Sequence, residues 1–160
     1  MNHIISVLVE NKAGVLAKIS GLFSRRGFNI ESLAVGPTED EEISRITILV
    51  NADKKGIEQV VKQLYKLINV IKIQELDPAN VVERELVLIK VATDAKSRAE
   101  ILEIVNIFRA NIVDVAKKSL LIEITGTSSK VEAMKELLDP YIIELTRTGK
   151  IACSRGSKRV

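Results

Sequence analysis

Two hydrophobic periods alternate along the first half of the chain. Apolar side chains recur every second residue, or run without a break, in four short segments that the pattern predicts to be strands: residues 3–9, 28–35, 43–50 and 70–73. Two segments between them repeat at helical spacing, with these apolar faces: Val15, Leu16, Ile19, Leu22 and Phe23, then Ile57, Val60, Val61, Leu64 and Leu67. Asp53 is a candidate N-cap for the second helix. The predicted order over residues 1–76 is β-α-β-β-α-β.

The same order returns after a break at residues 77–80, where a proline after an acid indicates a boundary. The pattern there predicts strands at 85–93, 111–116, 119–125 and 141–146, and helices at 97–108 and 130–138. A local match supports a repeat, because Ala110-Asn111-Ile112 parallels Phe28-Asn29-Ile30. We therefore predict an α+β protein of two tandem ferredoxin-like units, residues 1–76 and 84–160, joined by a linker at 77–83.

Each predicted unit is a four-stranded antiparallel sheet with two helices on one face, so its other face is uncovered. The predicted strands nevertheless carry apolar residues of both parities, as at Ile4 and Val7, which is more than one covered face needs. Units of this size bury little core alone, and contiguous exposed apolar surface usually marks an interface. We therefore expect the chain to self-associate.

The composition is that of a globular chain, with 46% hydrophobic and 28% charged residues among 160. Residues 1–7 lack the basic and apolar regions of a signal peptide, and no apolar run approaches the roughly 18 residues of a membrane span. The single cysteine, Cys153, cannot form an internal disulfide. We expect a cytoplasmic protein in which Cys153 is an unpaired thiol without a reactive role.

The net charge of +3 is unevenly distributed. Five basic residues and no acidic residue fall within residues 147–160, so the other 146 residues carry a net charge of −2. A basic tail of this size can bind nucleic acid or an acidic protein surface, but more often it is simply solvated, as we expect here.

The chain lacks the residues that most enzymes need. His3 is the only histidine, so we expect it to be structural rather than part of a metal site or an acid–base pair. Motifs for zinc proteases, nucleophile elbows, dinucleotides and P-loops are absent. RNA-recognition modules stack bases on aromatic side chains, which the predicted third strands lack. An acylphosphatase would need an arginine in the first loop, where this chain has Lys12. We therefore predict no catalytic residue and no metal ligand.

The most informative segment runs from strand to helix through a glycine turn, Asn11-Lys12-Ala13-Gly14. Glycine lets the backbone turn sharply, and the following helix offers unpaired N–H groups and a positive dipole end to a carboxylate. Asn11 and Asn29 stand at two strand ends. The second unit has Thr93-Asp94-Ala95-Lys96-Ser97 at the corresponding place and lacks the glycine, so only the first unit is expected to bind a ligand.

This segment resembles the start of an ACT domain, the amino-acid-sensing module of metabolic enzymes. With the run Phe-Ser-Arg-Arg-Gly-Phe-Asn-Ile-Glu-Ser-Leu at residues 23–33, it is most similar to the regulatory subunits of acetohydroxyacid synthase, also called acetolactate synthase. The similarity spans the chain through these shorter runs: Arg45-Ile46-Thr47, Asn69-Val70, Arg84-Glu85-Leu86, Arg147-Thr148-Gly149 and Ser154-Arg155-Gly156.

The resemblance implies a regulatory subunit that binds a branched-chain amino acid, usually valine, between the ACT domains of a homodimer. It implies activation and feedback inhibition of a separate large catalytic subunit, with the second unit sharing in that contact. Thiamine diphosphate, Mg²⁺ and FAD would belong to the catalytic subunit, and we expect no cofactor, nucleic acid or membrane to bind this chain. A stand-alone ACT-type sensor acting on another enzyme or regulator, and a small enzyme or RNA binder, stay open as alternatives.

The same resemblance implies the contacts of the effector. Asn11 and Asn29 would hydrogen-bond its polar ends across the dimer. Its carboxylate would meet the N–H groups of Gly14 and Val15, and Ala13 and Ile30 would line its apolar part.

Overall fold

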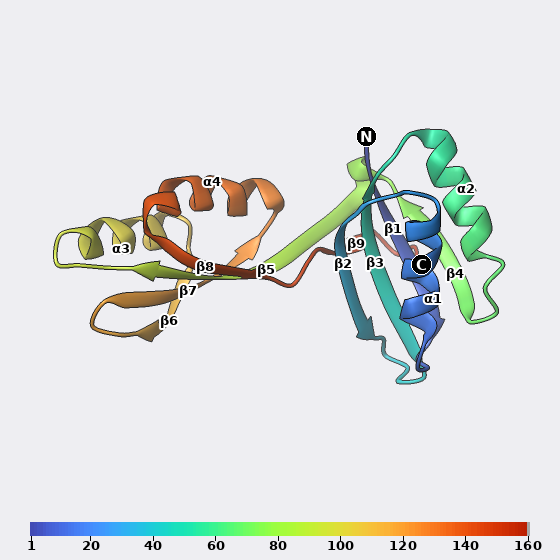
Figure 1. Cartoon of the computed structure of the whole chain (residues 1–160), viewed down its shortest axis with the longest axis horizontal. Coiled ribbons are helices and arrows are strands. Elements are labelled where there is room, and N and C mark those ends of the chain that lie inside the picture. Colours follow the sequence, from blue (N-terminus) through green and yellow to red (C-terminus); the bar gives the residue numbers. More distant parts are fainter. Residues whose placement is uncertain (160) are drawn as a thin grey trace. The chain divides into compact units, whose positions relative to one another are not determined.

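The computed structural model describes residues 1–159 and divides them into two compact units (Figure 1). One unit comprises residues 1–82 together with the segment from Lys150 onward, and the other comprises residues 83–149. Each unit is a β-α-β-β-α-β fold with an antiparallel sheet, so the predicted α+β class and the tandem ferredoxin-like units are confirmed.

The first unit follows the predicted element order closely. Its elements are β1 (Asn2–Glu10), α1 (Val15–Arg25), β2 (Ile30–Pro37), β3 (Ile43–Asn51), α2 (Lys54–Leu64) and β4 (Val70–Leu76). The strands lie in the order β2-β3-β1-β4, which places β2 and β4 at the edges of this path. Because β1 lies between β3 and β4, the turn that follows β1 projects from the centre of one end of the sheet.

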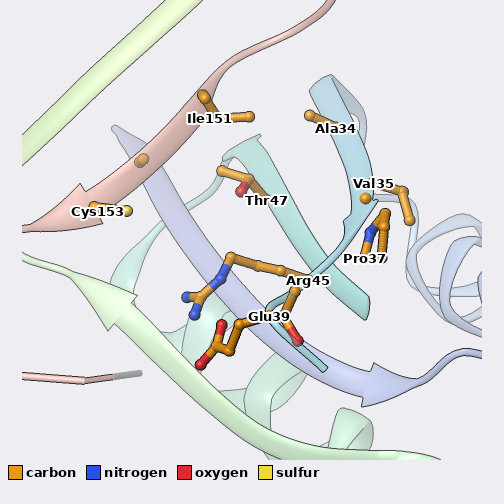
Figure 2. Close-up of a pocket in the computed structure, with 11 residues that line it drawn as sticks. Ala34, Val35, Pro37, Glu39, Arg45, Thr47, Ile151 and Cys153 are labelled. Atoms are coloured by element: carbon orange, nitrogen blue, oxygen red, sulfur yellow. The ribbon is translucent and has the colours of Figure 1, made fainter. Parts of the chain in front are cut away.

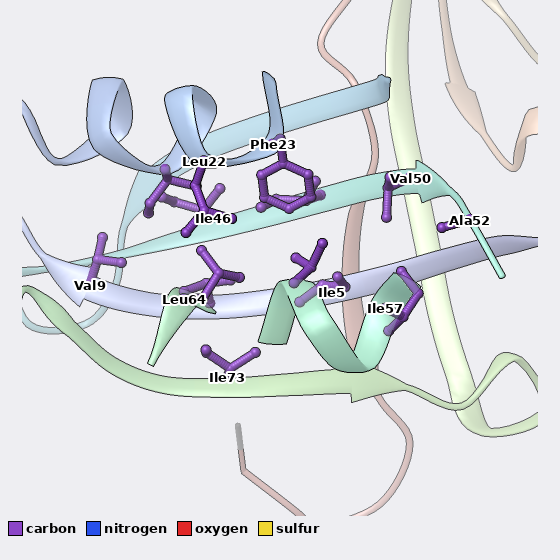
Figure 3. Packing of buried hydrophobic residues seen from close by; sticks show 14 of the residues in the cluster. Ile5, Val9, Leu22, Phe23, Ile46, Val50, Ala52, Ile57, Leu64 and Ile73 are labelled. Carbon is purple, nitrogen blue, oxygen red and sulfur yellow. The ribbon is translucent and has the colours of Figure 1, made fainter. Parts of the chain in front are cut away.

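One face of this sheet packs against both helices to form the main core. Figure 3 shows Leu22 and Phe23 of α1 lying over Ile46 of β3, with Ile57 and Leu64 of α2 in the same cluster. Phe23 and Leu64 are almost completely buried. Full burial of an aliphatic or aromatic side chain of this size contributes roughly 1.5–3 kcal/mol, so this face holds the helices to the sheet.

The predicted cap of α2 is present. The carboxylate of Asp53 accepts a hydrogen bond from the Gly56 N–H at 2.8 Å, which satisfies one of the unpaired donors at the start of the helix. Asp53 itself has extended backbone angles, as an N-cap residue should. The helix start predicted from the local sequence is therefore confirmed.

The second unit repeats the arrangement with its own core. Its elements are β5 (Val81–Ala92), α3 (Ser97–Ile107), β6 (Asn111–Val115), β7 (Ser119–Gly126), α4 (Ser128–Leu138) and β8 (Ile142–Arg147). The strand order is β6-β7-β5-β8, and every pairing along it is antiparallel. Val87 and Ile89 of β5 pack with Ile101 of α3 and Met134 of α4, all fully buried.

The structure corrects the predicted boundaries at both ends of the second unit. The predicted linker at residues 77–83 is a short 3₁₀ helix, Pro78–Asn80, capped by Asp77 and followed at once by β5. The compact second unit ends at Gly149 rather than Val160. Val160 itself lies outside the described residues.

Residues 150–159 return to the first unit and include a strand, although Arg155, Lys158 and Arg159 are exposed as a solvated basic segment should be. Strand β9 (Ile151–Ser154) pairs with β5, and Arg155 N–H donates to the Asn80 carbonyl at 2.7 Å. Ala152 is buried with Ile4, Leu49 and Leu76 on the sheet face opposite to the helices. The apolar residues of that face needed cover, and β9 supplies part of it within the chain. Self-association stays a prediction.

None of the helices that the structure describes is long and apolar enough to cross a membrane.

Candidate functional site

The glycine turn after β1 has the backbone geometry that its sequence predicts. Gly14 has φ +83°, in the left-handed region that favours glycine, and stands as the N-cap of α1 without any side-chain cap. The Val15 N–H donates to the Lys12 carbonyl at a long 3.4 Å. The Gly14 N–H donates to no backbone or side-chain acceptor among residues 1–159. This helix start therefore keeps donors for an external acceptor.

In the second unit, a side chain of the chain itself occupies the corresponding helix start. There the Asp94 carboxylate accepts from the N–H groups of Ser97 at 2.7 Å and Lys96 at 2.9 Å. The Ser97 backbone hydrogen bond is the main reason that the pKa of Asp94 lies below its ordinary value. The chain thus supplies its own anion at the start of α3, whereas the corresponding turn before α1 has the neutral Asn11.

Asn11 is held in place by the turn between β2 and β3. Its side-chain Nδ2 donates to the Glu41 carbonyl at 2.9 Å, and its backbone N–H donates to the Glu42 carbonyl at 2.7 Å. These residues border a hollow of about 500 Å³ that is also lined by Glu10 and Lys12. Lys12 Nζ lies 2.5 Å from Glu10 Oε2, and this hydrogen bond lowers the pKa of Glu10 below its ordinary value. The Asn11 side-chain oxygen stays available as an acceptor.

The six predicted site residues fall into two groups at opposite ends of the sheet. Glu10, next to Asn11, pairs with Ile43 of β3, whereas Ile30, next to Asn29, pairs with Val50. These two partners are seven positions apart along β3, which corresponds to roughly 23 Å at about 3.3 Å per residue. One chain therefore brings Asn11, Ala13, Gly14 and Val15 together, and Asn29 and Ile30 together, but does not join the two groups.

The predicted site residues also differ in how far their side chains are exposed to solvent. Ala13, Gly14 and Asn29 are exposed, and Ile30 is half-buried against the main core. The Val15 side chain is buried in that core, so only its backbone could meet a ligand.

The other chemistry-bearing residues have structural surroundings. His3 Nδ1 lies 2.5 Å from Glu75 Oε1, which fits a structural role. Cys153 is a free, exposed thiol, as predicted. Among residues 1–159, no group of three or more His, Cys, Asp or Glu side chains is placed to hold a metal ion.

Comparison with known families assigns both halves of the chain. The family model for the small-subunit-like ACT domain of acetohydroxyacid synthase matches residues 5–72, and the model for the small subunit of acetolactate synthase matches residues 84–156. The chain belongs to the acetolactate synthase small-subunit family. The resemblance read from the glycine turn and the shorter runs is thereby confirmed.

Relatives of the same family match along almost their whole length. The acetolactate synthase small subunit of Mycolicibacterium smegmatis is 55% identical over 159 residues, covering 99% of this chain and 94% of that protein. The probable small subunit of Archaeoglobus fulgidus is 56% identical over 160 residues, covering 99% and 100%. The crystal structure of the Thermotoga maritima small subunit has a TM-score of 0.92 at 47% identity and covers 99% of each chain.

The family match places the six predicted residues inside the ACT domain, and it extends beyond the second compact unit into β9. Sequence patterns missed β9 as a part of the first unit. Its signal was weak, since only Ile151, Ala152 and Cys153 form an apolar run between Lys150 and Ser154. The contacts of β9 with β5 and with the sheet are long-range, and no local pattern reports them.

Proposed function

We propose that this chain is a non-catalytic regulatory subunit that activates the catalytic subunit of acetolactate synthase and makes it sensitive to valine. The observation that carries the proposal is the match of both units to the acetolactate synthase small-subunit family. Thiamine diphosphate, Mg²⁺ and FAD would then act in the catalytic subunit. This chain would act in the cytoplasm.

The effector site we propose needs two copies of the chain. Strand β2 is an edge of its sheet, and its Val35 is 49% exposed. Antiparallel pairing of β2 with β2 of a second copy would place Ile30 of one chain beside Pro37 of the other. Since Pro37 pairs with Ser44, next to the partner of Glu10, this pairing would also bring Asn29 of one chain towards Asn11 of the other. A homodimer would therefore join the two groups of residues that one chain separates.

Each residue would have a definite part in binding valine. The carboxylate would accept from the Gly14 N–H and meet the positive end of the α1 dipole, equivalent to about half an elementary charge. The ammonium would donate to the side-chain oxygens of Asn11 and Asn29. Ala13 and Ile30 would contact the isopropyl group. Shared between two chains, the ligand would favour the packing of those chains in which both groups fit.

Regulation requires the bound effector to prefer one state of the assembly. Couplings of this kind are typically about 1–3 kcal/mol. An anion at a helix start contributes roughly 0.3–1 kcal/mol when exposed and up to about 2 kcal/mol when partly buried. One such contact in each chain, if it is partly buried and made in only one state of the assembly, would therefore supply a coupling of that order. The second unit would contribute to the contact with the catalytic subunit.

The test is an acetolactate assay with three samples: the catalytic subunit of the same source, this chain, and their mixture. We expect no acetolactate from this chain alone, a higher rate from the mixture than from the catalytic subunit, and a fall in that higher rate as valine is added. A mixture that works at the rate of the catalytic subunit alone would contradict the proposal and favour a sensor that acts on another protein. Acetolactate formed by this chain alone would contradict its non-catalytic role.

A further inference from the structure

The first unit has a cleft on the side of its sheet that faces away from α1 and α2. Figure 2 shows β2 and β3 along one side of this cleft and β9 along the other. Ala34 pairs with Thr47 and Gly36 with Arg45, so these four residues share the face opposite to the main core. The volume of about 380 Å³ falls in the range of roughly 300–1,000 Å³ that is typical of small-molecule sites.

One part of the cleft is apolar. Ala34 and Pro37 contribute from β2, and Ile151 and Ala152 contribute from β9. Ala152 is buried in the chain, but Ile151 is 61% exposed. A ligand that covers this exposed isoleucine is bound more tightly, because removing apolar surface from water contributes about 25 cal/mol per Å² to binding.

The other part of the cleft carries two opposite charges. Arg45 Nη1 donates to Ser6 Oγ at 2.9 Å, and Ser6 is fully buried, so one branch of the guanidinium is anchored. Arg45 makes no other side-chain hydrogen bond or ion pair within residues 1–159, which leaves its remaining N–H donors open. The Glu39 carboxylate lies near Arg45 in Figure 2, yet the two form no ion pair in the described part of the chain.

We propose that this cleft binds a small apolar α-amino acid as its zwitterion. Arg45 takes the carboxylate, since its planar fork of N–H donors suits the two oxygens of a carboxylate. Glu39 takes the ammonium group, and the aliphatic side chain lies against Ala34, Pro37 and Ile151. A ligand without the ammonium leaves Glu39 beside a second negative charge, and a ligand without the carboxylate leaves Arg45 open. The pair of charges therefore selects a zwitterion over either half of it.

The surroundings favour an anionic group at the Arg45 end. A neighbouring hollow of about 300 Å³ shares Glu39, Arg45 and Cys153 with the cleft and is also lined by Lys158 and Arg159. Three cationic side chains and one carboxylate therefore border this end, and their combined field attracts a carboxylate.

This site is separate from the predicted effector site, because it lies across the sheet from α1 and the Gly14 N–H. It also involves a different part of the chain. β9 follows the second unit in sequence, and it is tied to β2 where the Lys150 N–H donates to Ser32 Oγ at 2.8 Å. A ligand that contacts β2, β3 and β9 at once holds β9 on the sheet, so the amino acid in this cleft stabilises the returning segment.

The experiment is a titration of the full-length chain followed by the amide signals of its ¹⁵N-labelled form in nuclear magnetic resonance spectra. The probe is L-valine, with 3-methyl-2-oxobutanoate as the analogue without an ammonium group and isobutylamine as the analogue without a carboxylate. The amides of Ala34, Thr47 and Ala152 report the cleft, and the amide of Gly14 reports the predicted effector site in the same spectra. Each site is thereby measured separately.

The decisive variant is Glu39→Gln, because Glu39 is exposed and its replacement should leave the fold intact. Glu58→Gln, an exposed change of the same chemistry on α2, is the matched control. Arg45→Gln tests the carboxylate contact, but it also removes the hydrogen bond to buried Ser6, so the proposal does not depend on that variant alone.

We expect valine to shift the three cleft amides saturably, with affinity at least tenfold weaker in Glu39→Gln and unchanged in Glu58→Gln. We expect both analogues to bind at least tenfold more weakly than valine. Absence of saturable shifts in the cleft, equal binding by the two glutamine variants, or equal binding of 3-methyl-2-oxobutanoate would each overturn the proposal. Shifts in the cleft without any at Gly14 would support it and contradict the effector site under the proposed function, whereas the reverse pattern would do the opposite.

Discussion

Replacing Gly14 by aspartate tests the predicted effector site most directly. The new carboxylate would stand at the start of α1, where the effector's carboxylate is expected to accept its hydrogen bonds. A Cβ added at Gly14 meets nothing within 4 Å, so steric conflict inside the chain does not complicate the change. Gly14→Asn is the matched control, because asparagine has nearly the same shape without the charge.

The effect on folding is the sum of two opposing terms. Gly14 has φ +83°, and a left-handed conformation costs an ordinary L-residue roughly 1–2 kcal/mol, with aspartate and asparagine at the favourable end. A negative charge at a helix start returns about 0.3–1 kcal/mol to the aspartate variant alone. We therefore expect both variants to lose no more than about 1–2 kcal/mol of stability, with Gly14→Asp the less affected of the two.

Binding of the effector should be affected in the opposite order, with Gly14→Asp weakened more than Gly14→Asn. In Gly14→Asp the ligand's carboxylate meets a like charge and loses space, so we expect the valine concentration for half-inhibition to rise at least tenfold, which corresponds to about 1.4 kcal/mol. Gly14→Asn removes space only and should shift it less. Activation of the catalytic subunit by either variant should persist, since the second unit is unchanged.

The assay is acetolactate formation by the reconstituted complex over a range of valine concentrations, with circular dichroism melts and a sedimentation measurement to confirm folding and dimerisation. If both variants stay folded and dimeric and their valine curves overlay that of the unmodified chain, the effector does not bind at this helix start. If asparagine weakens the response more than aspartate, charge repulsion is not the reason.

Three further predictions concern the two compact units. Ala152→Asp should destabilise the chain by at least about 2 kcal/mol in denaturant unfolding, because it places a charge in the buried contact of β9, whereas Cys153→Asp on the exposed side of the same strand should change stability by no more than about 0.5 kcal/mol. Arg147→Ala should destabilise the chain by about 1–3 kcal/mol, because Glu85 is 5% exposed and lies 3.6 Å from Arg147, which is itself 33% exposed. Adding Glu85→Gln should restore part of that loss. Hydrogen bonding to Arg147 lowers the pKa of Glu132, so this pair stabilises the fold above the ordinary glutamate pKa of 4.5. The stabilisation is lost as the pH falls below that value. In Glu132→Gln, the free energy of unfolding should therefore fall less over that pH range than in the unmodified chain.

The sequence predicted what local patterns determine. Asp53 predicts the start of α2 because its carboxylate caps the helix by accepting a hydrogen bond from the N–H three residues later. Gly14 predicts a left-handed turn because few other residues adopt that conformation. The place of β9 was not predictable in the same way. Its contacts with Ile4 and Leu49 span long stretches of sequence, and four residues are too few to show a period.

The candidate site shows a second limit of local reasoning. Asn11 and Asn29 were assigned one ligand through a family resemblance, yet the register of β3 puts them at opposite ends of one sheet. We propose that a second copy of the chain joins them, and no pattern within one chain states how two copies pair. The cleft beside β9 could not be predicted from local patterns either, because its walls come from two segments far apart in the sequence, residues 34–47 and 151–153.

Strand β2 connects these observations physically. It is the edge along which we propose that two copies pair, it lines the cleft through Ala34 and Pro37, and its Ser32 accepts a hydrogen bond from the Lys150 N–H at 2.8 Å. Lys150 is the first residue after the second unit. In the proposed dimer, a ligand that changed how β2 pairs between copies would therefore act on a strand that is hydrogen-bonded to the first residue after the second unit. A coupling of about 1–3 kcal/mol is of the same order as one or two hydrogen bonds, so gain or loss of the Ser32–Lys150 hydrogen bond would be a change of the size that such a coupling requires.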